Sequence, residues 1–196
     1  MKAQTQKLYT WATEKAASSR SPLWLALLFS LELFLIVPLD AVLLFFCSQN
    51  PRKTFLYVTL ATLTSTLSGL AGYLFGHLLW DLIGPYLVPS LIPASAFDRF
   101  ASHFQLYEHW AVFFGTLLPF PLKALSLASG VFHIGLLPFL TYMFFARLLR
   151  FSLSGIAMIL WGPKVKTLLD KYHHHVFLAL GIKTLLAAGL FWLIAK

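Results

Sequence analysis

The chain has 196 residues, of which 59% are hydrophobic and only 11% are charged, and its mean hydropathy is +0.77. Soluble domains carry about a quarter of their residues as charges, so this composition excludes an ordinary soluble domain and predicts an all-α integral membrane protein. The net charge of +8 arises mostly from basic residues that flank apolar blocks, where they set orientation and attract anionic lipid head groups, and it does not predict nucleic-acid binding.

Residues 1–21 precede the first apolar block and are mostly polar. Lys2, Lys7 and Lys15 together with Leu8 and Trp11 suit a short amphipathic helix on the cytoplasmic membrane surface. The apolar run that follows is longer than the core of a signal peptide, so we expect no cleavage.

Five apolar blocks lie near residues 22–47, 54–80, 110–136, 137–161 and 175–195, and each is about long enough to cross a hydrocarbon core. No linker rich in Pro, Gly or Ser separates them, which favours one compact bundle. We divide the chain into the amphipathic segment 1–21, a membrane domain 22–162, and a region 163–196 with a basic cytoplasmic loop and a last transmembrane helix.

Prolines interrupt the first and third blocks at Pro38, Pro119 and Pro121. Proline removes a backbone donor and breaks or kinks a helix, and broken backbone at membrane depth persists only where protein or water satisfies its polar groups. We therefore predict two re-entrant helical hairpins plus about three transmembrane helices. Full crossing by residues 22–47 and 110–136 remains the alternative.

An internal repeat relates the two proline-containing blocks. The sequence PLDAVL at residues 38–43 matches PLKALS at residues 121–126, an offset of 83 residues, and Asp40 in the first copy is replaced by Lys123 in the second. Hairpins that enter from opposite sides form an inverted repeat, a plan that places a substrate site near the bilayer midplane.

The second block carries small residues at helical spacing, namely Ser68, Gly69, Gly72 and Gly76. Small side chains let helices approach closely in lipid, so we assign these residues to helix packing.

Five ionisable residues are expected deep in apolar sequence: Glu32, Asp40, Lys123, Arg147 and Arg150. Each costs roughly 2.5 to 3.5 kcal/mol at a bilayer centre, so they must face one another or water. A purely structural explanation is a set of salt bridges, with the two arginines also able to snorkel to an interface.

The functional explanation is a single polar site. Two acids and three bases leave one unit of positive charge. An anionic head group bound to Lys123, Arg147 and Arg150 would neutralise it. A carboxylate in a low-dielectric setting binds protons more readily, so Glu32 and Asp40 are candidates for a proton and charge relay.

The sequence predicts no enzyme, cofactor or metal site. It contains no P-loop, no G-x-S-x-G and no G-x-G-x-x-G motif, and no nucleophile is recognisable beside a base. The single Cys47 excludes an intramolecular disulfide. His77, His103, His109 and His133 form no H-E-x-x-H motif and have no cysteine partner, and residues 173–175 suit interfacial solvation better than metal capture.

Several of these features in order resemble the DedA family, also described by its SNARE-associated or VTT domain, and particularly its YqaA-like branch. The resemblance covers about residues 22–162 and rests on Glu32 to Asp40, Asn50-Pro51-Arg52, Gly69-x-x-Gly72-Tyr73-x-x-Gly76, Pro119-Phe120-Pro121-Leu122-Lys123 with Ala128-Ser129-Gly130-Val131, and Ala146-Arg147-x-x-Arg150-Phe151.

The resemblance implies a multi-pass protein of the bacterial inner membrane with two facing re-entrant hairpins and a role in membrane homeostasis. Members are similar to flippases or scramblases of phospholipids and undecaprenyl phosphate, and some depend on the proton gradient. The family's essential acids would correspond to Glu32 and Asp40, and its basic residues to Lys123, Arg147 and Arg150. Lys123 stands where many members carry arginine, which keeps the charge but loses the bidentate geometry.

The sequence thus leads to a membrane transporter of anionic lipid, with protons as a second partner and a homo-oligomer compatible with the chain. The alternative is a non-transporting membrane protein whose ion pairs only stabilise the hairpins.

Overall fold

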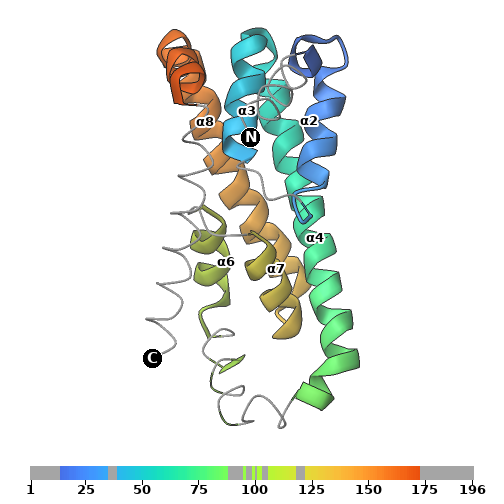
Figure 1. Cartoon of the computed structure of the whole chain (residues 1–196). Coiled ribbons are helices and arrows are strands. Elements are labelled where there is room, and N and C mark those ends of the chain that lie inside the picture. Colours follow the sequence, from blue (N-terminus) through green and yellow to red (C-terminus); the bar gives the residue numbers. More distant parts are fainter. Residues whose placement is uncertain are drawn as a thin grey trace. The chain divides into compact units, whose positions relative to one another are not determined.

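A computed structural model describes residues 14–34, 39–87, 106–117 and 122–172, together with residues 95, 99, 101 and 102. All regular secondary structure in these residues is helical, which confirms the predicted all-α class for this part of the chain (Figure 1). Of the predicted surface helix in residues 1–21, only the part from residue 14 is described, and it is helical to residue 17. The predicted helix near 175–195 lies outside the described residues.

The first and third apolar blocks each hold two short helices. The first block contains α2 (Ser21–Ser30) and α3 (Leu39–Gln49), and the third contains α6 (Glu108–Leu117) and α7 (Leu122–Val131). Within each pair the two helices contact one another. The predicted helix breakers Pro38, Pro119 and Pro121 lie outside the described residues.

The second and fourth blocks form long helices. A short 3-10 turn, η1 (Pro51–Lys53), leads into α4 (Thr54–Leu87), and α8 covers Leu136–Tyr172. The segments Pro51–Leu82 and Leu136–Gly162 are long and apolar enough to cross a membrane. Near the end of the second segment the backbone of Trp161 is not helical, with φ −125° and ψ 24°, so α8 is kinked there.

Many large apolar side chains on these helices are exposed. Phe55 at the start of α4 is 85% exposed, and Leu67, Leu82, Leu137 and Ile159 are also exposed. Large exposed apolar surfaces are unusual on soluble monomers and mark contact with lipid or with other proteins.

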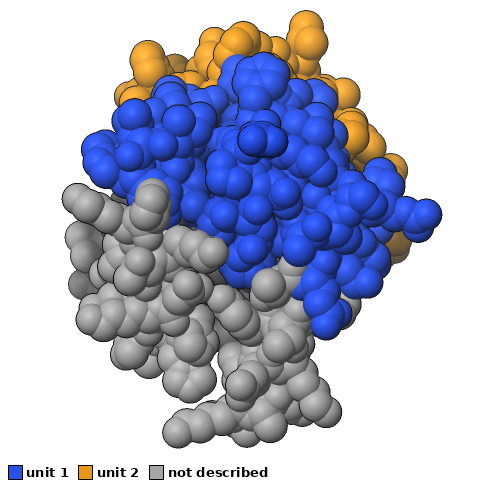
Figure 2. Space-filling view, turned by 90° about the horizontal axis from the view of Figure 1, so that it is seen from above, with its two compact units in different colours: residues 1–65, 148–182 blue, residues 66–147, 183–196 orange. Residues whose placement is uncertain are grey.

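The chain divides into two compact units (Figure 2). Unit 1 comprises residues 1–65 and 148–182, and unit 2 comprises residues 66–147 and 183–196. Among described elements, unit 1 therefore contains α2, α3, η1, the start of α4 and the later part of α8. Unit 2 contains the rest of α4, α6, α7 and the start of α8.

Aromatic rings fill the core of unit 1. The rings of Phe29 on α2 and Phe151 on α8 meet edge to face, with centroids 5.4 Å apart, and Phe46 on α3 meets Tyr57 on α4 in the same way at 6.0 Å. All four side chains are almost completely buried. A hydrogen bond of 2.8 Å between the hydroxyls of Ser21 and Tyr57 satisfies the polar end of the tyrosine.

Unit 2 is held together by a close approach of α4 and α7. A Cβ atom on Gly76 would lie 2.3 Å from the carbonyl oxygen of Leu127, and one on Gly130 would lie 2.1 Å from that of Tyr73. Only glycine therefore fits at these two positions. The Tyr73 hydroxyl also donates a hydrogen bond of 2.5 Å to the carbonyl of Ile134, just after α7. Ser68, Gly69 and Gly72, assigned to packing with Gly76, are buried too.

Candidate functional site

The clearest polar site in unit 1 is an ion pair between α3 and α8. Arg150 Nε donates a hydrogen bond of 2.9 Å to Asp40 Oδ1, and Arg150 Nη2 donates to Oδ2 of the same carboxylate. The arrangement is bidentate, the strongest and most directional form of such a pair. The partners are 110 residues apart in sequence, so tertiary packing of the two helices creates the site.

The surroundings of this pair are apolar. The side chains of Asp40 and Arg150 are 30% and 16% exposed, and their chain neighbours Leu39 and Phe151 are buried, as is Leu43 one turn further along α3. Asp40 also lies in the first turn of α3, where the helix dipole stabilises a negative charge. Removing one member of such a pair leaves a poorly solvated charge and destabilises the protein, whereas the intact pair contributes little net free energy of folding.

The second predicted relay acid, Glu32, is held by a hydrogen bond from a serine hydroxyl. Glu32 is half-buried in the turn that follows α2, and its Oε2 accepts a hydrogen bond from Ser65 Oγ on α4. Ser65 is fully buried. A hydroxyl can donate to an ionised carboxylate or accept from a protonated one, so this contact is compatible with either charge state of Glu32.

Within unit 1 the structure pairs two residues of the predicted charge cluster. Asp40 and Arg150 are paired in unit 1, which also contains Glu32, so Arg150 contacts an acid and does not simply snorkel to an interface. Arg147 is buried and belongs to unit 2. Lys123 lies on α7, also in unit 2, but its side chain is outside the described part. The repeat matches Asp40 with Lys123, a correspondence that stays a prediction; the partner observed for Asp40 is Arg150.

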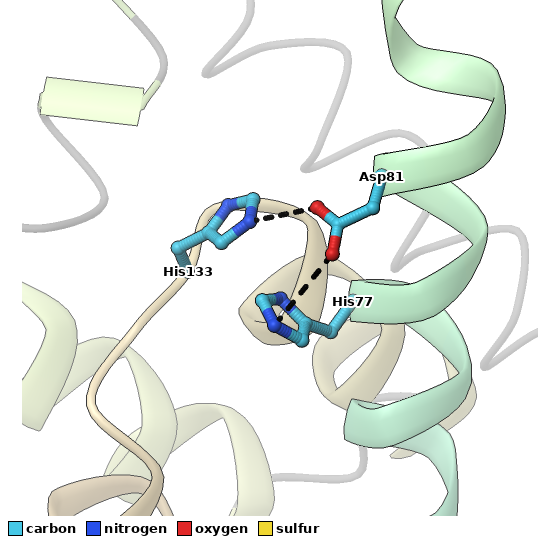
Figure 3. A group of neighbouring side chains, drawn as sticks. All are labelled: His77, Asp81 and His133. Carbon is cyan, nitrogen blue, oxygen red and sulfur yellow. Dashed lines mark hydrogen bonds and ion pairs between the residues drawn. The ribbon is translucent and has the colours of Figure 1, made fainter.

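Unit 2 contains a polar group that the sequence analysis did not predict. His77 and Asp81 on α4 and His133 after α7 point toward one another (Figure 3). The i, i+4 spacing of His77 and Asp81 was a usable signal, because it puts both side chains on one helix face. The contribution of His133, 52 residues beyond Asp81, could only come from the packing of α7 against α4.

Comparison with known proteins adds no identification. No protein-family model matches the chain, and no curated protein and no solved structure matches it.

Proposed function

We propose that this protein is a membrane transporter of the DedA type, in its YqaA-like branch, that moves an anionic lipid between leaflets as a flippase or scramblase. The lipid would be a phospholipid or undecaprenyl phosphate, and the setting the bacterial inner membrane. The observation that carries the proposal is the bidentate Asp40–Arg150 pair, set in an apolar unit between α3 and α8.

Membrane insertion is supported by two long apolar helices and by their exposed apolar side chains. Phe55, Leu67 and Leu82 on α4 and Ile159 on α8 would each be costly in water and favourable in lipid. In that setting an ionised residue is expensive unless it is paired, and its presence usually marks a transport or binding role.

The order of the helices supports the proposed inverted repeat of re-entrant hairpins. Helices α3 and α7, which carry Asp40 and Lys123 of the repeated sequence, each precede a long helix. The long helices α4 and α8 begin at Thr54 and Leu136, an offset of 82. Each unit thus contains two short apolar helices and parts of both long ones.

The chemistry of the pair suggests how head groups and protons would compete. The guanidinium fork of Arg150 matches a phosphate as well as it matches the carboxylate of Asp40. When Asp40 takes up a proton it loses its charge, its ion pair with Arg150 weakens, and the guanidinium can exchange the carboxylate for a lipid phosphate. We propose Glu32 as a second proton carrier, and Lys123 and Arg147 as further head-group ligands.

The competing function is structural, and the same pair motivates it. A neutral bidentate bridge between α3 and α8 would also hold unit 1 together without moving anything.

Reconstitution of the full-length protein in vesicles tests the transporter directly. We expect fluorescent anionic phospholipid or labelled undecaprenyl phosphate to equilibrate between leaflets faster than in protein-free vesicles. An imposed pH gradient shows whether the movement is coupled to protons. No acceleration for any anionic lipid would overturn the proposal.

A charge exchange separates transport from structural bridging. The double variant Asp40→Arg with Arg150→Asp restores an ion pair of reversed orientation, so we expect it to fold but to lose lipid movement. Exchanging two exposed charges, Glu14→Arg with Arg52→Glu, is the matched control and should move lipid normally. If the exchange at Asp40 and Arg150 left transport intact, the site would be wrongly assigned.

A further inference from the structure

The group formed by His77, Asp81 and His133 has the composition and spacing of a metal site. His133 Nε2 lies 3.2 Å from Asp81 Oδ1, and His77 Nε2 lies 3.8 Å from Asp81 Oδ2 (Figure 3). One ligand atom from each residue lies within 4.8 Å of the other two. Two ligands at 2.0–2.1 Å from a tetrahedral zinc ion are about 3.4 Å apart, so small side-chain rotations would bring all three atoms into bonding range.

The backbone at His133 is held in an unusual conformation. Its φ is 53°, in the left-handed region, and it is the one described residue other than glycine with a positive φ. Ile134 N–H donates to the carbonyl of Ser129, and His133 N–H donates to that of Gly130. These two bonds form a Schellman motif at the end of α7, in which His133 occupies the position that usually carries glycine. A histidine there costs conformational energy, and such sites are often functional.

The hydrogen bonds of His133 indicate that a cation lies between its Nε2 atom and the Asp81 carboxylate. Its Nδ1 lies 3.0 Å from the carbonyl oxygen of Val131, which can only accept, so Nδ1 carries a proton. In the neutral ring Nε2 then has a lone pair that faces the Asp81 carboxylate, which is also an acceptor. Either a second proton or a metal ion must lie between them. A carbonyl that fixes the distal nitrogen is the usual second-shell partner of a metal-bound histidine.

The second histidine presents the same nitrogen. His77 Nδ1 is buried without a hydrogen-bond partner among the described residues, so Nε2 is its ring atom available to Asp81 or to an ion. The rings of His77 and His133 meet edge to face, with centroids 4.5 Å apart, and the Nε2 atom of each faces an oxygen of the Asp81 carboxylate (Figure 3).

The surrounding structure fixes the distance between the two contributing segments. Gly76 and Gly130 bring α4 and α7 into backbone contact, and the Tyr73 hydroxyl holds the carbonyl of Ile134, the residue next to His133. A ligand set supported in this way is preorganised. The side chains remain open to solvent, with His77, His133 and Asp81 exposed by 36%, 47% and 54%, so water or another ligand can reach a fourth position.

We propose that His77, Asp81 and His133 bind a divalent first-row transition-metal ion, with Zn²⁺ as the best match to two imidazoles and one carboxylate. The ion completes the contacts of His133 and cross-links α4 to the end of α7. This site is independent of the lipid transport proposed for Asp40 and Arg150.

The test is titration of the purified full-length protein, without a polyhistidine tag, with Zn²⁺ after chelator treatment and dialysis. Because His173, His174 and His175 are a second source of imidazoles, all proteins carry asparagine at these three positions. We expect one equivalent of Zn²⁺ by calorimetry and by elemental analysis. No binding in this background would overturn the site and leave a proton shared by His133 and Asp81.

Two variants locate the ion and avoid confusion with misfolding. His133→Gly removes a ligand but supplies the residue that the Schellman position favours, and Asp81→Asn keeps the side-chain shape. Each should weaken Zn²⁺ binding by at least about 100-fold with unchanged helical circular dichroism, since even second-shell changes cost 10–100-fold. His109→Asn, an exposed histidine outside the group, should bind normally. Equal affinity in all variants would overturn the assignment.

Discussion

The two units place aspartates in opposite surroundings. In unit 1, Asp40 meets an arginine, which is always charged, through two hydrogen bonds in a largely enclosed setting. In unit 2, Asp81 meets two histidines, which unlike arginine are charged only when protonated, in an exposed setting. The comparison shows two ways to stabilise a carboxylate in an apolar chain. Asp40 has an always-charged arginine partner in an enclosed setting, and Asp81 has histidine partners, charged only when protonated, at an exposed position.

The largest expected effect comes from neutralising the enclosed carboxylate. Asp40→Asn removes the charge that Arg150 bonds through two hydrogen bonds, and we expect the free energy of unfolding to fall by about 2–3 kcal/mol, below the range for completely buried pairs because both side chains retain some exposure. Thermal unfolding in detergent measures the loss. The exposed Glu14→Gln serves as the control, and an equal loss there would contradict the argument.

Breaking the packing of unit 2 should come next. In Gly130→Ala the new Cβ would lie 2.1 Å from the carbonyl oxygen of Tyr73, so α4 and α7 must move apart, at a cost of about 2 kcal/mol. The same variant should lose Zn²⁺ binding, because His133 moves with the end of α7. Gly162→Ala is the control, since its Cβ meets nothing within 4 Å. A Gly130→Ala protein that still binds zinc would separate the metal site from this contact.

A smaller effect should follow from keeping the positive charge at position 150 but replacing the guanidinium group. Arg150→Lys retains one positive charge and loses the fork that bonds both oxygens of Asp40. We expect a loss of about 1 kcal/mol in unfolding free energy, together with slower lipid movement in vesicles. Full transport by Arg150→Lys would show that the bidentate geometry is not needed.

The smallest effect is expected for the carboxylate of unit 2 in the absence of metal. Asp81→Asn should change the free energy of unfolding by less than about 1 kcal/mol, because exposed pairs with histidine are weak and are screened by salt. Measuring it beside Asp40→Asn under identical metal-free conditions compares the two units directly. Equal destabilisation by the two variants would remove the distinction drawn between them.

Sequence reasoning located the long helices better than the partners of the charges. Apolar length alone predicted blocks near 54–80 and 137–161, which the structure forms as parts of α4 and α8. The need of Asp40 for a counter-charge was also predictable, because an unpaired carboxylate in apolar sequence is costly. The choice of Arg150 was not, because Asp40 and Arg150 are 110 residues apart and no local spacing connects them.

The zinc site proposed in unit 2 was hidden for a different reason. Metal-site motifs are recognised by local spacing, and the group has only one local element, the i, i+4 pair of His77 and Asp81 on α4. The third residue sits where a helix normally ends in glycine, so nothing in the sequence distinguished His133 from an ordinary loop residue.

The kink of α8 at Trp161 has a consequence for how the protein would sit in a bilayer. The helix has 37 residues, whereas about 20 cross a hydrocarbon core of roughly 30 Å, so a straight rod would carry its basic end far into the aqueous phase. Tryptophan favours the lipid–water boundary, so the kink at Trp161 would lie at the membrane surface. The part of α8 beyond Trp161, which contains Lys164 and Lys166, would then lie along the membrane surface. There it would fix the position of α8 along the bilayer normal.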